Sequence, residues 1–160
     1  MKKLNLGCGS DYKEGWVNVD CRGNVNVDKI YDLNKFPYSF KDNTFNEIYV
    51  SHVLEHLDDP IKVLMEIIRI SENGAKIIIK VPHAYSYANV ASIQHKANFT
   101  ENSFTPGHLK EYDLEDLKLT RMEFTYENKW KKFIPLKKYL KIFLNGLYDD
   151  LYFEFRVKKF

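Results

Sequence analysis

The sequence has few cysteines, and this scarcity excludes one common way of stabilising a small protein. Cys8 and Cys21 are the two cysteines among 160 residues, and neither has another cysteine or a histidine nearby at the spacing of zinc ligands. Two cysteines cannot supply the disulfide framework of a small secreted domain, so the expected environment is a reducing compartment. We therefore expect a cytoplasmic protein.

Long apolar runs and a strong charge bias are also missing. No segment approaches the roughly 20 apolar residues of a membrane-spanning helix, and the N-terminus lacks the apolar stretch of a signal peptide. Lysine and arginine number 24 against 22 for aspartate and glutamate, which gives no general attraction to nucleic acid. The sequence predicts one soluble domain over residues 1–160, with no transmembrane segment and no nucleic-acid partner.

Apolar segments alternate with polar connections along the chain. Residues 75–82 contain three consecutive isoleucines, which predict a strand buried on both faces of a parallel sheet. Residues 58–74 place Pro60 in a first helical turn and repeat apolar residues at helical spacing. This strand–helix–strand order predicts a doubly wound α/β sheet. Strands are expected at 2–6, 16–20, 27–33, 44–51, 75–82, 121–130 and 151–160, with further helices at 113–119 and 135–146.

A glycine loop follows the first expected strand. Gly7 and Gly9 lack side chains, so a ligand can approach the backbone there. Asp20 ends the second expected strand, and its carboxylate can accept hydrogen bonds from both hydroxyls of a ribose. Ligands of open parallel sheets bind outside the carboxyl ends of the strands. This loop is therefore the expected binding site.

The spacing around this loop differs from that of a nicotinamide dinucleotide site. Tyr12 stands where the third glycine of that fingerprint would be, and Asp20 follows Gly7 more closely than the usual distance of about 20 residues. The connection from Ser10 to Gly15 is too short for a helix that could bind a pyrophosphate at its N-terminus. We therefore expect a cofactor without phosphate. S-adenosylmethionine, with its ribose diol, amino acid end and sulfonium, meets this requirement.

Four successive motifs resemble those of a known family. They are LNLGCG, GWVNVD, YDLNKFPYSFKDNTFNEIYVSHVLEHLDDP and KIIIKVPH, and they span roughly residues 3–103. In this order they resemble the motifs of class I S-adenosylmethionine-dependent methyltransferases, particularly the methyltransferase type 11-like proteins. The resemblance implies a Rossmann-like sheet of about seven strands with an antiparallel last strand. The first helix would be shortened or absent.

The resemblance also implies which residues bind the cofactor. The glycine loop would pass under the methionine end, Asp20 would bind the ribose hydroxyls, and Asp32 with Leu33 would flank the adenine. Asn5 stands where the family often has an acid, but its amide can still bond to the loop or to the ammonium of the cofactor. The full expected set is Asn5, Gly7, Cys8, Gly9, Asp20, Asp32, Leu33, Ser51 and His52.

The segment SHVLEHL at 51–57 has the order His-x-x-Glu-His of one class of zinc metallopeptidase. On a helix, His52 and His56 would share one face and could bind one zinc ion. The flanking residues oppose a long helix, so a zinc metallopeptidase using His52, Glu55 and His56 is a remote alternative. Two interpretations without metal stay open. The polar side chains bond locally, or Ser51 and His52 line the cofactor.

Residues 84–112 have no clear periodicity, which predicts an acceptor-binding loop or lid. Methylation of an oxygen or nitrogen releases a proton, so a general base is expected nearby. His83 and His95 are the candidate catalytic residues, because imidazole titrates close to neutrality. Structural or solvated histidines are equally consistent with such a loop, and alignment of the acceptor can suffice for the reaction.

The segment 129–147 combines lysines with aromatic rings. Such a composition can bind an anionic membrane surface, which is the lesser alternative here. Leucines and a phenylalanine recur on one helical face, and this pattern favours a crossover helix packed on the sheet. The residues of that face are Leu136, Leu140, Phe143, Leu144 and Leu147.

Together these features predict an S-adenosylmethionine-dependent methyltransferase that acts on a small polar acceptor, such as a sugar or a glycan precursor. The substrate class rests on the resemblance alone. The alternative is a catalytically degenerate S-adenosylmethionine-binding or scaffold domain, which Asn5 and the absent first helix would explain. A homodimer is a further expected assembly, because a second chain could cover the exposed cofactor.

Overall fold

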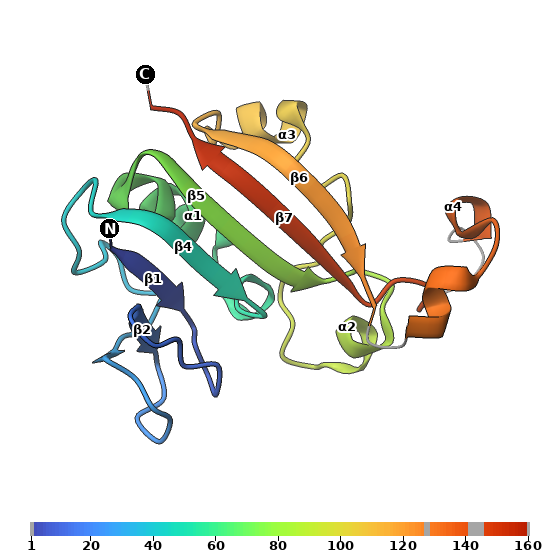
Figure 1. Ribbon diagram of the computed structural model, residues 1–160, viewed down its shortest axis with the longest axis horizontal. Coiled ribbons are helices and arrows are strands. Elements are labelled where there is room, and N and C mark those ends of the chain that lie inside the picture. The colour runs from blue at the N-terminus through green and yellow to red at the C-terminus, as the bar shows by residue number, and fades with distance from the viewer. Residues whose placement is uncertain (1, 127–128, 141–145, 160) are drawn as a thin grey trace.

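One seven-stranded sheet organises the computed structural model, which describes residues 2–126, 129–140 and 146–159 (Figure 1). The strands are β1 (Lys3–Leu6), β2 (Val17–Asp20), β3 (Lys29–Ile30), β4 (Phe45–Ser51), β5 (Ser71–Pro82), β6 (Leu117–Thr125) and β7 (Asp150–Val157). The helices are α1 (Pro60–Ile70), α2 (Tyr87–Ala91), α3 (Pro106–Glu111) and α4 (Lys137–Leu140), with short 3-10 helices η1 (Leu54–His56) and η2 (Lys129–Phe133).

The strand order is β3-β2-β1-β4-β5-β7-β6. Strands β1 to β5 pair in parallel, and β7 is antiparallel to both of its neighbours, β5 and β6. The order reverses direction between β1 and β4, which is the switch point of a doubly wound sheet. Residues 7–16 connect β1 to β2 without a helix. The expected Rossmann-like fold, with its antiparallel last strand and missing first helix, is confirmed.

The hydrophobic core lies on one face of the sheet. A cross-strand row on that face is formed by Leu4, Ile48, Ile77 and Phe155, all fully buried. Helix α1 contributes buried residues to the same core, and in Figure 1 α1 and α3 lie behind the sheet. Asp59 caps α1 by accepting a hydrogen bond from the backbone N–H of Lys62, and Pro60 fixes its first turn.

The opposite face of the sheet carries half-buried and charged residues. The neighbouring cross-strand row consists of Asn5, Tyr49, Ile78 and Glu154, and ion pairs join Lys3 to Glu47, Lys76 to Glu154 and Lys80 to Asp150. The expectation that 75–82 is buried on both faces is therefore wrong. Ile77 and Ile79 face the core, whereas Ile78 is half-buried between two lysines.

The element boundaries near the C-terminal half also differ from those expected. The helix expected at 113–119 lies earlier, as α3, because Pro106 opens it and the Thr105 side chain accepts a hydrogen bond from the His108 N–H. Strand β6 begins at Leu117 and ends at Thr125, before the strand expected at 121–130 would end. Strand β6 pairs with β7 from Leu117 to Thr125, so tertiary pairing determines these boundaries more than local propensity does.

The basic, aromatic segment forms an arm of η2 and α4 that extends away from the sheet in Figure 1. Leu136 of the expected apolar face is 69% exposed, so the beginning of that face does not pack on the sheet as expected, whereas Leu147 at its end is buried. Phe143 and Leu144 lie outside the described residues. Membrane-surface contact through 129–147 stays a prediction. No helix in the described part of the chain is both long and apolar enough to span a membrane.

Arg69 of α1 holds the loop that leads from β3 to β4. Its guanidinium donates hydrogen bonds to the carbonyls of Phe40 and Tyr38, each at 3.0 Å, and it pairs with Glu66 at 2.8 Å. The Tyr38 hydroxyl then donates to the carbonyl of Leu33. The hydrogen bonds from Arg69 lower the pKa of Glu66 despite the opposing effect of burial. This network ties the loop to the core.

We expect Arg69→Lys to lower the free energy of unfolding by about 1–2 kcal/mol, because one ammonium cannot replace the several bonds of a planar guanidinium. Urea denaturation measures the change. Arg121→Lys is the matched control, since Arg121 pairs with Glu123 at the exposed surface and should change stability by less than about 0.5 kcal/mol. Equal effects of the two substitutions would contradict the role of Arg69.

Candidate active site

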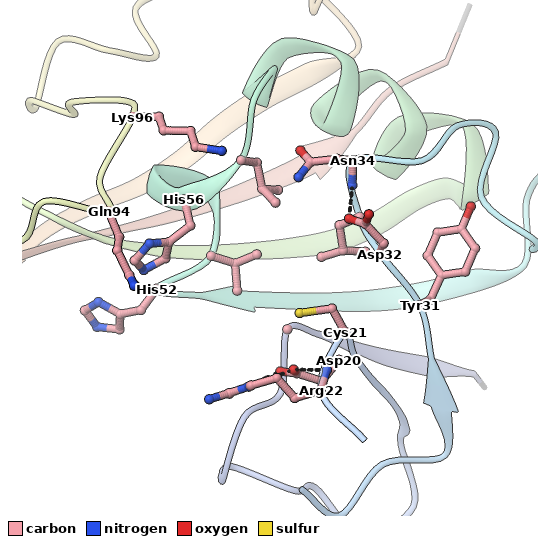
Figure 2. A pocket seen from close by; sticks show the side chains of 14 residues that line it. Asp20, Cys21, Arg22, Tyr31, Asp32, Asn34, His52, His56, Gln94 and Lys96 are labelled. Atoms are coloured by element: carbon pink, nitrogen blue, oxygen red, sulfur yellow. Dashed lines mark hydrogen bonds and ion pairs between the residues drawn. The ribbon is translucent and has the colours of Figure 1, made fainter. Parts of the chain in front are cut away.

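A cleft of about 540 Å³ opens at the carboxyl ends of the parallel strands, and this volume suits a small-molecule ligand (Figure 2). The loops after four strands line it, through Gly7 after β1, Asp20 at the end of β2, Tyr31 after β3 and His52 after β4. These strands meet at the switch point of the sheet, where the sequence predicts the binding site.

Gly7 adopts a conformation that other residues rarely adopt. Its φ is +64°, and a Cβ atom added there would lie 2.2 Å from Cγ2 of Val53. A side chain at this position is therefore excluded both by the backbone and by the packing beneath the loop. The bare backbone of Gly7 lines the cleft, as expected for a loop that a ligand approaches closely.

Asp20 joins the glycine loop to the second strand. Its Oδ2 accepts a hydrogen bond from the Gly9 N–H at 2.8 Å, and its Oδ1 accepts from the backbone N–H and the Nε of Arg22 at 2.9 and 3.0 Å (Figure 2). Burial raises the pKa of this carboxyl, but the bonds from Arg22 and Gly9 outweigh burial and leave the pKa below its ordinary value. The carboxylate is thus held in its charged form at the cleft.

Two residues of the expected cofactor set turn away from the cleft. Asn5 donates its amide hydrogens to the carbonyl of Asp11 at 2.7 Å and to Oδ1 of Asn18 at 3.0 Å, so it supports the loop. The Cys8 side chain is buried, and burial raises the pKa of its thiol. The sequence allows the Asn5 amide to bond either to the loop or to the ammonium of the cofactor, and the structure shows the bond to the loop. The side chains of Asn5 and Cys8 are outside the cleft lining.

The expected adenine-binding segment lines the cleft together with its neighbours. Asp32 and Leu33 border the cleft, with Tyr31 and Asn34 on either side of them. Asp32 accepts a hydrogen bond from the Asn34 N–H at 3.0 Å, which shapes the turn (Figure 2). The expected pair is thus brought beside Asp20, and Tyr31 and Asn34 are additions that the sequence interpretation missed.

A residue with a strained backbone follows strand β4. His52 has φ +54°, and its N–H donates to the carbonyl of Lys80, so the chain turns sharply after Ser51. His52 lines the cleft, whereas Ser51 is the last residue of the strand and lies outside the lining. Residues with a left-handed backbone are enriched at functional sites, because the surrounding structure must hold them there.

The zinc metallopeptidase interpretation requires an α-helix at 51–57, and this fully described segment contains none. His52 precedes the 3-10 helix η1, which contains Glu55 and His56, so the two histidines do not occupy successive turns of one α-helix. Figure 2 shows His52, His56 and Gln94 gathered at one end of the cleft. The peptidase alternative is therefore wrong in its geometry, while the histidines themselves border the predicted cofactor site.

The two candidate bases occupy different surroundings. His83 is buried, contacts Glu101 at 3.4 Å and packs near Tyr148, and it is outside the cleft lining. His95 lies beside His56, with ring centroids 4.7 Å apart. Burial lowers the pKa of His95, which keeps its imidazole neutral near pH 7. The structure thus places His95 beside His56 of the cleft lining.

The segment 84–112 borders the cleft through Gln94 and Lys96, which the sequence interpretation missed. The N–H of Lys96 donates to the carbonyl of Glu55 at 2.7 Å and thereby fixes the segment beside η1. Phe99 is buried in the core, whereas Tyr87 is largely exposed. Neither ring lines the cleft, and the polar side chains of Gln94 and Lys96 form this side of it.

Comparisons with known proteins agree with the fold. A family model described as a methyltransferase domain matches residues 4–126. The structure resembles an S-adenosylmethionine-dependent methyltransferase from Archaeoglobus fulgidus, with 20% identity, a TM-score of 0.69 and coverage of 97% of this chain and 85% of the other. It also resembles such an enzyme from Mesorhizobium loti, with 12% identity, a TM-score of 0.67 and coverage of 97% and 90%. The comparison with curated proteins gave no match.

Proposed function

The chain belongs to the class I S-adenosylmethionine-dependent methyltransferases, and we propose that it methylates a small polar acceptor of the sugar or glycan-precursor type. S-adenosylmethionine supplies the activated methyl group when it is bound. One observation carries the proposal. Gly7 and Asp20, from neighbouring strands, line the same cleft as the loop 31–34. This arrangement offers a bare backbone, a carboxylate and a turn to one extended nucleoside ligand.

Each of these residues has a proposed role that follows from its chemistry. The Gly7 backbone would lie against the methionine end, because no side chain separates it from the cleft. A carboxylate offers about four acceptor sites, and Arg22 occupies some of those of Asp20. Asp20 would therefore accept hydrogen bonds from the ribose hydroxyls once the Arg22 side chain moves aside. Asp32 and Leu33 would border the adenine. The connection at 7–16 has no helix and offers no N-terminus to a pyrophosphate.

The remaining wall of the cleft suits an acceptor that carries hydroxyl groups. His56, Gln94 and Lys96 are polar side chains on this wall, and each can donate hydrogen bonds. The segment 84–112, from which two of them come, remains our proposed acceptor-binding loop. A sugar or glycan precursor would match these groups better than an apolar acceptor, because unpaired polar groups oppose the burial of apolar surface.

Titration calorimetry with S-adenosylmethionine and with S-adenosylhomocysteine tests the cofactor site. We expect both ligands to bind in the ratio of one per chain, and we expect nicotinamide adenine dinucleotide to give no heat, because the site lacks a pyrophosphate-binding helix. Absence of heat from both sulfur ligands at millimolar concentration would contradict the proposed site.

Methyl release over a panel of nucleotide sugars, small phenols and RNA then tests the acceptor class. We expect turnover with a nucleotide sugar. Turnover with phenols or RNA alone would refute the acceptor class. Cofactor binding without turnover on any acceptor would instead support the degenerate binding domain.

A further inference from the structure

Glu55 has an unusual environment for a charged residue. It lies in η1, its exposed fraction is 0%, and neither carboxylate oxygen receives a hydrogen bond within the part of the chain that the structure describes. His52 Nδ1 lies 3.5 Å from Oε1, within ion-pair range but without hydrogen-bond geometry. Burying a carboxylate without partners costs several kcal/mol, so a bound cation would explain why the residue is tolerated there.

Two imidazoles meet this carboxylate. Glu55, His56 and His95 each offer one ligand atom, and these atoms lie within 4.8 Å of one another. Tetrahedral ligands at about 2.0–2.2 Å from one ion lie roughly 3.3–3.6 Å apart, so a small movement of these side chains would close the group around an ion. His56 reaches the group from η1, and His95 reaches it from the segment 84–112. The cluster therefore combines residues from two distant parts of the sequence.

The protonation of His95 is fixed by its neighbour. Asn89 donates its amide hydrogens to the carbonyl of Ala84 at 3.0 Å and to Oδ1 of Asn98 at 2.7 Å, so its own Oδ1 must be the acceptor that faces His95. His95 Nδ1 lies 2.9 Å from that oxygen and must therefore carry the hydrogen. Its Nε2 is left with a lone pair, which is the state of a metal-binding imidazole.

The backbone holds the two parts of the cluster together without any ligand. The carbonyl of Glu55 accepts hydrogen bonds from the N–H groups of Lys96 and Ala97, at 2.7 and 3.2 Å. These bonds place His95, the residue before Lys96, beside η1. A cluster held in this way loses little conformational entropy when it binds an ion.

We propose that Glu55, His56 and His95 bind a divalent transition-metal ion at the acceptor end of the cleft. One carboxylate and two imidazoles form a ligand set that suits Zn²⁺ and similar ions and leaves coordination positions open. From the sequence we expect no metal in the favoured interpretation, and the remote zinc alternative uses His52 in place of His95. The folded chain supplies a different third ligand.

The site would also define the acceptor more closely, and this step rests on the proposed function. His56 lines the cleft, so an ion bound to it would face the acceptor. An open position of the ion would bind an acceptor hydroxyl and lower the pKa of that hydroxyl, which promotes loss of its proton. We therefore infer an oxygen acceptor whose proton passes to solvent water, after which the oxygen takes the methyl group and the S–CH3 bond of the cofactor breaks.

Equilibrium dialysis of the metal-stripped full chain against Zn²⁺, in the absence of cofactor, tests the site. We expect about one retained zinc ion per chain, a raised melting temperature, and a visible absorption band when Co²⁺ replaces Zn²⁺. Glu55→Gln and His95→Gln should reduce retained metal to background. His108→Gln is the matched control, because His108 lies on α3 outside the cleft and its loss should leave zinc content unchanged.

A second variant tests the metal site even if the substitution of a ligand residue disturbs folding. Asn89→Ala leaves the three ligands in place but removes the acceptor that orients His95, together with the bonds to Ala84 and Asn98, and it should weaken zinc affinity by about 10–100-fold. Wild-type protein without retained zinc, or equal loss in His108→Gln, would overturn the metal site. Cofactor calorimetry is separate from zinc dialysis. Zinc binding without cofactor binding would refute the proposed function alone, and the reverse result would refute the metal site alone.

Discussion

Gly7→Ala is expected to abolish cofactor binding and to lower the free energy of unfolding by about 2–5 kcal/mol. The left-handed backbone costs an L-residue about 1–2 kcal/mol, and overpacking against a buried side chain costs a further 1–3 kcal/mol. The second term arises here because the new methyl group would overlap Val53. Either the glycine loop or the first turn after β4 must move, and both border the cleft.

Gly15→Ala measures the cost of the left-handed backbone without the cost of overpacking. Gly15 also has a positive φ, +76°, but a Cβ there would meet no atom within 4 Å. It should therefore cost only about 1–2 kcal/mol and leave cofactor affinity unchanged. Adding Val53→Ala to Gly7→Ala removes the overlap and should recover part of the binding. Urea denaturation and calorimetry measure both effects, and equal losses in the two glycine variants would contradict the packing argument.

Asp20→Asn should weaken S-adenosylmethionine binding by roughly 10–150-fold, which corresponds to about 1.5–3 kcal/mol for lost charged hydrogen bonds. The substitution keeps the shape of the side chain but replaces one acceptor by a donor. That donor would face either the Gly9 N–H or Arg22, both of which already donate. The glycine loop and the ribose site are thus weakened by the same change.

Two controls separate these contributions. Arg22→Ala removes the partner that competes for the carboxylate, so it should leave binding unchanged or tighten it, and strong loss of affinity would show that Arg22 contacts the cofactor itself.

The pH dependence of stability gives the second control. The folded-state pKa of Asp20 lies below its ordinary value of 3.8, so its stabilisation is complete above that pH and is lost as the pH falls below it. Asp20→Asn should lack this loss.

The parts of the site that were predictable are those with a local signal. Gly7 and Asp20 stand directly after short apolar segments, and the ends of parallel strands meet at one edge of the sheet. Asp32 and Leu33 were recognisable through the resemblance. Arg22 carries no such signal, because an arginine beside an aspartate is common in loops, and its contact with the cleft depends on how the loop folds back.

The proximity of His95 to Glu55 depends on the tertiary structure in a different way. The two residues lie in separate segments, and backbone bonds from the segment 84–112 to η1 bring them together. No periodicity in either segment encodes this contact. The same limit explains the error at Ile78, since a run of isoleucines indicates burial but does not state what covers each face of a sheet.

The strand order has a consequence for association between copies of the chain. The edge strands are β3, which has two residues, and β6, whose exposed side chains include Lys118 and Arg121. Short edges and charged edges both disfavour the addition of a further strand. The sheet is therefore protected against edge-to-edge aggregation, and a homodimer of the expected kind would have to form through another surface, such as the charged face opposite α1.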